Sequence, residues 1–146
     1  EQKPAFSVCS RLMDRLDEGD AGKIINRVAG SSAPMRLGEI RVLGGAMGRV
    51  PSSETAFAHR SSRVMVSFIA VYGDPGEQAV HDRWAADGIA ELPQEMDRVY
   101  VNFLLTDPAE RIHAAYPPQT LERLKLVKRR YDPENLLRLN RNVTPA

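Results

Sequence analysis

Hydrophobic side chains recur at steps of three and four near the end of the chain. Leu121, Leu124, Val127 and Tyr131 follow this spacing and share one face of a predicted helix. Pro133 disfavours helical geometry at the preceding residue and ends this helix, after a basic last turn that suits the negative end of the helix dipole. A second apolar run follows at once: Leu136, Leu137 and Leu139. Because these leucines would otherwise be exposed, we expect them to dock the C-terminus onto a larger body.

The first third of the chain has two helical patterns and one strand pattern. The first helix is predicted from Phe6, Cys9, Leu12, Met13 and Leu16, with Gly19 and Gly22 closing it. Residues 24–28 suit a short second helix that ends at Gly30. Residues 35–43 alternate apolar and polar side chains, mostly with a period of two, which predicts a half-buried strand.

Three glycines follow that strand, at Gly44, Gly45 and Gly48. A phosphate loop needs a turn from a strand into a helix, where backbone amides converge on the anion. Residues 49–53 do not begin a helix with an apolar face. We therefore expect a glycine bend between strands at this point.

The middle of the chain predicts a buried strand followed by a helix. Residues 63–72 are apolar at both alternating sets of positions, which is typical of a central strand covered on both sides. A helix is expected over 77–91, with Val80 and Trp84 on its inner face. Residues 99–104 predict another short strand.

Prolines mark the boundaries of the last predicted elements. Asp107 and Pro108 open a short helix that reaches Ala115, and Pro117 and Pro118 open the terminal helix. The elements show neither an internal repeat nor a regular alternation of strand and helix. We therefore predict one domain over residues 1–146 with an α+β fold: a mainly antiparallel sheet with helices packed on one face. A doubly wound parallel sheet is the alternative.

Composition limits the classes of function. A formal net charge of +1 is too balanced for a nucleic-acid binder, and no apolar run approaches the length of a membrane span. Cys9 is the only cysteine and the three histidines lack metal-ligand spacing, so we predict neither an intrachain disulfide nor a metal site. The first residues lack the apolar core of a signal peptide, and we expect a cytoplasmic protein.

Four segments, in order, resemble the berberine-bridge-enzyme-like family of FAD-linked oxidases. Residues 43–51 are similar to the family's glycine-rich strand that ends in Arg-Val-Pro, and residues 55–60 to its Thr-Ala-Phe-Pro-His-Arg turn. Residues 99–103 are similar to its Tyr-x-Asn strand. Residues 121–145 resemble its C-terminal signature, a basic helix followed by Tyr-Asp-Pro-x-Asn.

The resemblance implies the C-terminal part of such an oxidase, whose antiparallel sheet roofs the flavin ring. It implies FAD as cofactor, although no motif for the pyrophosphate or for covalent flavin attachment is present, so we expect no flavin on this chain alone. It also implies Asn102, Asn140 and Asn142 as cofactor contacts. In family members that read Tyr-x-Asn-Tyr, the last tyrosine is assigned as the base; here that position is Phe103, which cannot accept a proton, and Tyr100 is left as the catalytic candidate.

Each candidate also has a plainer structural interpretation. Tyr100 would simply pack with its hydroxyl hydrogen-bonded, and His59 with Arg60 would form a turn in which the arginine pairs with a carboxylate.

Two functions remain open at this point. The first is the substrate-domain portion of an FAD-dependent oxidase of alcohols, sugars or amines with O2 as acceptor, with a flavin-binding domain or subunit as partner. The alternative is a free-standing, flavin-free binding module whose apolar surface is covered by formation of a homo-oligomer.

Overall fold

A three-stranded antiparallel sheet organises the computed structural model, which describes residues 3–93, 96–104, 111–139 and 141–146. The strand order is β1-β3-β2, so β3 is central and hydrogen-bonds to a neighbour on each side. The α+β prediction is confirmed. The elements in chain order are β1 (Ala5–Met13), α1 (Glu18–Ala29), β2 (Met35–Val42), α2 (Ala46–Arg49), β3 (Val64–Tyr72), η1 (Pro75–Glu77), α3 (Gln78–Ala90), η2 (Val101–Phe103), α4 (Ile112–Ala115) and α5 (Pro118–Tyr131).

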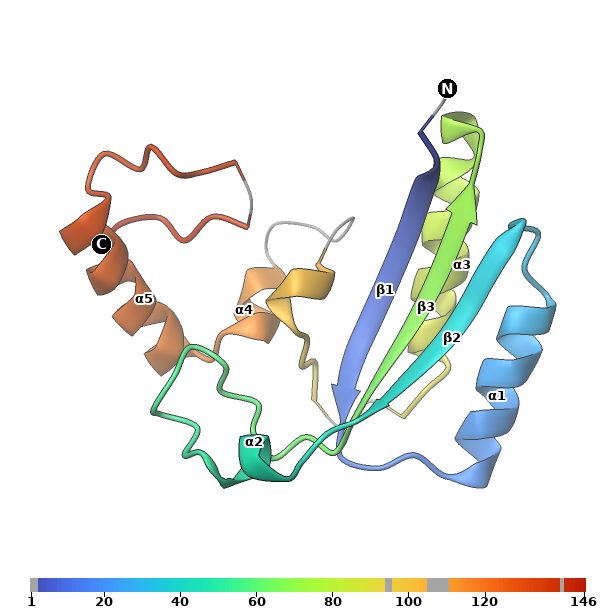
Figure 1. Cartoon of the computed structure of the whole chain (residues 1–146), viewed down its shortest axis with the longest axis horizontal. Coiled ribbons are helices and arrows are strands. Elements are labelled where there is room, and N and C mark those ends of the chain that lie inside the picture. Colours follow the sequence, from blue (N-terminus) through green and yellow to red (C-terminus); the bar gives the residue numbers. More distant parts are fainter. Residues whose placement is uncertain (1–2, 94–95, 105–110, 140) are drawn as a thin grey trace.

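Helices α1 and α3 cover one face of the sheet, and the segments that carry α2, α4 and α5 extend beyond the β1 edge (Figure 1). The main core lies between this face and the two helices, where Phe68 of β3 packs edge-on against Trp84 of α3 with ring centroids 5.7 Å apart. The Trp84 prediction is confirmed. Val80, predicted on the same inner face, is instead 61% exposed, because the inner stripe of α3 runs through His81, Trp84, Ala85, Gly88 and Ile89.

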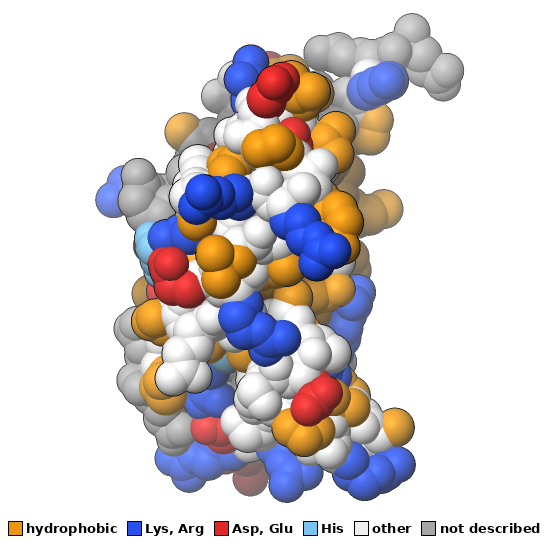
Figure 2. Space-filling view, turned by 90° about the vertical axis from the view of Figure 1, so that its left-hand side faces the viewer, with side chains coloured by type: hydrophobic (Ala, Val, Ile, Leu, Met, Phe, Trp, Pro, Cys, Tyr) orange, Lys and Arg blue, Asp and Glu red, His pale blue; other side chains and the backbone are white. Residues whose placement is uncertain are grey.

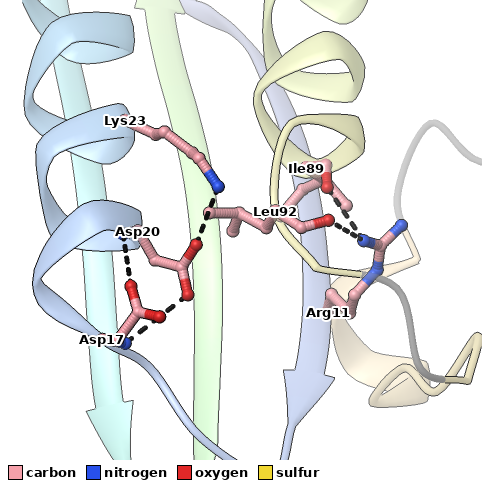
Figure 3. Close-up of polar contacts among 6 residues, drawn as sticks. All are labelled: Arg11, Asp17, Asp20, Lys23, Ile89 and Leu92. Carbon is pink, nitrogen blue, oxygen red and sulfur yellow. Dashed lines mark hydrogen bonds and ion pairs between the residues drawn. The ribbon is translucent and has the colours of Figure 1, made fainter.

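Residues 5–13 form a strand, so the predicted first helix is wrong. Both faces of β1 are buried, and polar side chains lie among its apolar ones, which removes the period-two signal of a strand. One of these polar residues, Arg11, is buried because its Nη1 donates to the carbonyls of Ile89 and Leu92 at 2.9 and 3.3 Å, where α3 ends (Figure 3).

Gly19 and Gly22 lie inside α1 rather than at the end of a preceding helix. Asp17 caps α1: its carboxylate accepts from the Asp20 N–H at 2.9 Å, while the Asp20 side chain accepts in return from the Asp17 N–H (Figure 3). Lys23 donates to Asp20 at 2.9 Å and completes the first turn. The predicted end of this helix at Gly30 is confirmed.

Residues 99–104 contain the 3₁₀ helix η2 instead of the predicted strand. Val99 and Leu104 are buried with Ala115 in a second small cluster, separate from the sheet core. Their apolar alternation therefore reflects packing against α4, to which Val99 is also joined by a hydrogen bond from its N–H to the Ala114 carbonyl at 3.3 Å. The predicted strands over 35–43 and 63–72 are confirmed as β2 and β3, and the terminal helix as α5.

The terminal helix α5 ends where Pro133 predicts, and Asp132 forms the turn that follows. Its carboxylate accepts from the N–H groups of Leu136 and Leu137 at 2.8 and 3.0 Å and from Lys128 Nζ at 2.5 Å. Asn135 has a φ of 52°, the left-handed geometry that asparagine tolerates. None of the helices in the described part of the chain is long and apolar enough to cross a membrane.

Two glycines allow the helices to approach the sheet. A Cβ at Gly88 of α3 would lie 2.8 Å from the Phe68 ring, and one at Gly38 of β2 would lie 2.7 Å from Ile24 of α1. Such short contacts force neighbouring atoms to move, and overpacking of a core typically costs about 1–3 kcal/mol.

We expect Gly88→Ala to lower the free energy of unfolding by about 1–3 kcal/mol, because its methyl group meets the buried Phe68 ring. Chemical denaturation followed by circular dichroism measures the change. Gly22→Ala in α1 is the control, since a Cβ there meets no atom within 4 Å and alanine favours a helix. Equal destabilisation by both substitutions would contradict this account of Gly88.

Candidate functional site

The candidate site lies on the face of the sheet that α1 and α3 leave uncovered. Paired residues of neighbouring strands point to the same face, and the register aligns Leu12, Met65 and Arg41 across β1, β3 and β2. This row forms the floor of a pocket of about 280 Å³. The remaining walls come from residues 43–60 and from the segment before η2: Leu43, Met47, Phe57, Arg60 and Tyr100.

The aromatic rings of Phe57 and Tyr100 line one side of the pocket. The ring of Tyr100 packs edge-on against Phe57 with centroids 5.6 Å apart, and it lies 6.0 Å from that of Phe103. The Arg41 guanidinium lies over the Phe103 ring at 4.9 Å, within cation–π range. The pocket therefore combines apolar walls with a few charged or hydroxyl-bearing groups, as small-molecule sites usually do.

Tyr100 and Asn102 come together, although not on a strand. In the turn of η2 the Asn102 Nδ2 donates to the Tyr100 hydroxyl oxygen at 2.7 Å. Because that oxygen is the acceptor, the phenol O–H stays available as a donor to a bound molecule. The two side chains lie next to each other, as a shared site requires. The strand over residues 99–104, on which that prediction was based, is absent.

The tail returns to the same region. Arg141 Nε donates to the carbonyl of Leu104, one residue after η2 ends, so the tail contacts the segment that follows η2. The Asn142 Oδ1 is buried without a hydrogen-bond partner. Asn140, predicted with it as a cofactor contact, lies outside the described residues.

The turn over residues 55–60 is structural, and the expected carboxylate partner of Arg60 is replaced by other oxygens. Arg60 Nε donates to the Phe57 carbonyl at 2.9 Å, Nη1 to the Met47 carbonyl at 3.3 Å and Nη2 to Thr55 Oγ1 at 2.5 Å. His59 Nε2 lies 2.8 Å from the Ala114 carbonyl, and burial lowers the pKa of its imidazole. These bonds hold one wall of the pocket against α4.

A buried arginine anchors the segment that carries Tyr100. Arg98 donates to both carboxylate oxygens of Asp14, at 2.9 and 2.6 Å, and to Ser62 Oγ at 3.2 Å. The hydrogen bond from Arg98 lowers the pKa of the Asp14 carboxyl, against a smaller opposing effect of burial. The end of β1, the start of β3 and the Tyr100 segment are thereby joined.

The remaining predictions concern the glycines after β2, the cysteine and a metal site. Gly44 and Gly45 both have positive φ, as a glycine bend requires, but the four-residue helix α2 follows them, which the sequence did not predict. Cys9 is buried in β1 rather than lying in a helix. The described residues contain no group of three or more His, Cys, Asp or Glu side chains that could hold a metal ion.

Sequence reasoning did not predict Arg41, Met47 or Met65 as site residues. A usable signal existed for Arg41, because the alternation over residues 35–43 places its polar side chain on the same strand face as Leu37 and Glu39. Met47 and Met65 come from different segments, and only the fold brings them together.

Comparison with known proteins agrees with this geometry. Residues 99–144 match the family model "Berberine and berberine like". Over 108 residues the chain is 33% identical to "Uncharacterized FAD-linked oxidoreductase YgaK" of Bacillus subtilis (strain 168), covering 72% of this chain and 23% of that protein. The chain is a relative of the berberine-bridge-like FAD-linked oxidoreductases.

Solved structures of the berberine-bridge-like family share the fold. A berberine-bridge-like protein of Arabidopsis thaliana aligns with a TM-score of 0.80 and 18% identity over 98% of this chain and 34% of its own. Chitooligosaccharide oxidase aligns with a TM-score of 0.74 and 21% identity over 97% of this chain and 33% of its own. The chain thus spans about a third of the length of these two structures.

We expect Asp14→Asn to destabilise the protein near neutral pH and to have progressively less effect in acid. The Asp14 pKa is lowered on folding, so the carboxylate adds stability above its ordinary pKa, and this stability is lost as the pH falls through the lowered value. Thermal unfolding of both proteins from pH 7 to pH 2 measures the difference. Glu54→Gln, at an exposed loop carboxylate, is the control and should show no such dependence.

Proposed function

We propose that this chain forms the substrate-domain portion of an FAD-dependent oxidase that acts on alcohols, sugars or amines with O2 as acceptor. The supporting observation is an apolar surface with no cover in the described part of the chain. Phe6, Met35 and Leu37 are each about half exposed on the sheet face away from α1 and α3. Large uncovered apolar areas mark surfaces that bind another body.

The C-terminal tail has a second apolar surface of the same kind. Leu136, Leu137 and Leu139 are 70%, 81% and 97% exposed, although the Asp132 turn holds the first two in a defined conformation. On the side of the molecule that carries α5, hydrophobic side chains alternate with Lys and Arg (Figure 2). Such a mixed surface suits a partner with apolar and acidic groups, and we propose a flavin-binding domain as that partner.

The residues present fit one part of FAD. Tyr100 offers a hydroxyl group in an apolar pocket, and the Asn102 amide donates to that hydroxyl, which suits the edge of a flavin ring or a substrate lying on it. The bound flavin would accept the electrons of the oxidation. Gly44 and Gly45, the two glycines with positive φ, precede the four-residue helix α2, and a helix that short offers little dipole for a pyrophosphate.

Within this proposal the chain's own residues have limited, defined roles. The phenol of Tyr100 donates a hydrogen bond to the substrate, and Asn102 fixes its orientation. The aromatic wall of Phe57 and Tyr100 shields the pocket from water, which strengthens polar contacts inside it. Phe103 transfers no proton.

We expect the purified chain to retain FAD when mixed with the flavin-binding portion of the Bacillus subtilis relative, as a yellow complex after gel filtration. Leu137→Ser should weaken this assembly about tenfold or more, because burying a leucine contributes about 1.5–3 kcal/mol. Ile25→Ser is the control, since Ile25 is 66% exposed on α1, away from the tail. Failure to retain flavin with any such portion would refute the proposal.

The same exposed leucines support a second function, a flavin-free module that covers its apolar surface by self-association. This alternative predicts a concentration-dependent dimer in sedimentation velocity, reduced by Leu137→Ser and unchanged by Ile25→Ser. A monomer at all concentrations, together with flavin-dependent assembly, would reject it.

A further inference from the structure

A small pocket lies where the end of β1 meets the residues that precede η2. The Leu12 N–H donates to the Arg98 carbonyl at 2.8 Å, so the two segments are in direct contact. The pocket beside this contact has a volume of about 10 Å³, the least room that one water-sized species needs. Its walls come from residues 11–15 and from three residues of the second segment: Pro93, Met96 and Arg98.

Arg11 brings a buried positive charge to this pocket. Its side chain is 6% exposed, and its hydrogen-bond acceptors are the neutral carbonyls of Ile89 and Leu92 (Figure 3). Burial lowers the pKa of the guanidinium, and the attraction of Asp97 only partly offsets this effect. Asp97 is itself paired with Arg111 at 2.7 Å. Because an arginine stays protonated at neutral pH, the buried charge of Arg11 requires a counter-ion.

Two buried N–H groups on the walls of the pocket have no acceptor. They belong to the Nε atoms of Arg11 and Arg98. The other nitrogens of Arg98 are occupied, because they donate to the Asp14 carboxylate and to Ser62 Oγ. Buried polar groups are nearly always paired, and an unpaired one indicates a water molecule or an ion at that place. Both arginines line this one pocket, which makes it the place for the missing acceptor.

The charges around the pocket favour an anion over a water molecule. Three of the lining residues are arginines: Arg11, Arg15 and Arg98. Asp14, the carboxylate among the described lining residues, is already paired with Arg98 at 2.6 Å. A water molecule accepts hydrogen bonds but leaves the charge of Arg11 uncompensated. A monovalent anion supplies both the acceptor and the negative charge.

The size and the walls of the pocket restrict that anion further. Sulfate and phosphate are much larger than a water molecule and do not fit the available volume. Leu12, Met13, Pro93 and Met96 make much of the wall apolar, and a strongly hydrated anion pays a high desolvation cost in such surroundings. Chloride and bromide, which are single atoms of modest hydration, suit both conditions.

We propose that Arg11 and Arg98 bind one halide ion between the end of β1 and the residues before η2. The ion ties β1 to the segment that carries Tyr100, because Arg98 lies two residues before that tyrosine. Leu12 lines both this pocket and the candidate site, so the two are neighbours. The halide site goes beyond the proposed oxidase function and needs neither flavin nor substrate.

Bromide tests the site directly, because its anomalous X-ray scattering distinguishes it from water. Crystals of the full chain grown in sodium bromide should show an anomalous peak beside Arg11 and Arg98. In solution, thermal unfolding is compared in sodium sulfate and sodium chloride at equal ionic strength. General salt effects stabilise a protein more in sulfate, whereas binding at this site raises the melting temperature in chloride, with saturation.

Variants assign the effect to the pocket. Arg11→Gln should abolish the bromide peak and the chloride-dependent rise in melting temperature, but it also loses hydrogen bonds to the end of α3. Arg15→Gln is therefore the second variant. The exposed Arg15 lines the pocket, and its loss should weaken bromide binding about two- to fivefold, the range expected for an exposed charge. Arg83→Gln, which removes an exposed charge on α3, is the matched control and should leave bromide binding unchanged.

A water molecule in the pocket of the bromide crystal would overturn this inference. A melting temperature that is no higher in chloride than in sulfate would do the same, as would equal bromide affinity of Arg15→Gln and Arg83→Gln. All of these measurements are made without flavin, so their outcome is independent of the test of the oxidase.

Discussion

The pairing of β3 with both of its neighbours is the constraint on which the rest of the structure depends. Its register with β1 and β2 decides which side chains lie beneath α1 and α3 and which form the floor of the pocket. A slip of one residue would exchange the two faces. Phe68 would leave the core, and Ser67 would enter it without a partner.

The two faces of the sheet differ in how their side chains are packed. The face toward the helices is a tightly packed core, in which Gly38 and Gly88 permit contacts that any side chain would obstruct. The other face keeps apolar side chains at one end, a polar row of Ser10, Ser67 and Glu39 in the middle and a pocket at the other end. The solved structures of chitooligosaccharide oxidase and of the Arabidopsis thaliana berberine-bridge-like protein are each about three times as long as this chain.

The pocket depends on arginines that tie distant segments together. Arg98 joins the Tyr100 segment to Asp14 and Ser62, Arg60 closes the loop over residues 47–57, and Arg141 brings the tail to Leu104. Each guanidinium donates to carbonyl or carboxylate oxygens of another segment of the chain. The walls of the site are therefore positioned by hydrogen bonds, and the sheet supplies only its floor.

The sequence by itself determined the elements whose signals are local. The alternation in β2, the apolar run of β3, the amphipathic pattern of α5 and the Asp132-Pro133 stop all depend on neighbours within a few residues, and all are confirmed. The four family motifs likewise sufficed to recognise the relatives. Only the tertiary structure determined that residues 5–13 form β1, because the charged Arg11 of this strand is buried by hydrogen bonds to the end of α3, far along the chain. It also decided that residues 99–104 turn into η2 to pack on α4, and that Ser10, Glu39 and Ser67 share one row, since strand register joins positions that no local pattern relates.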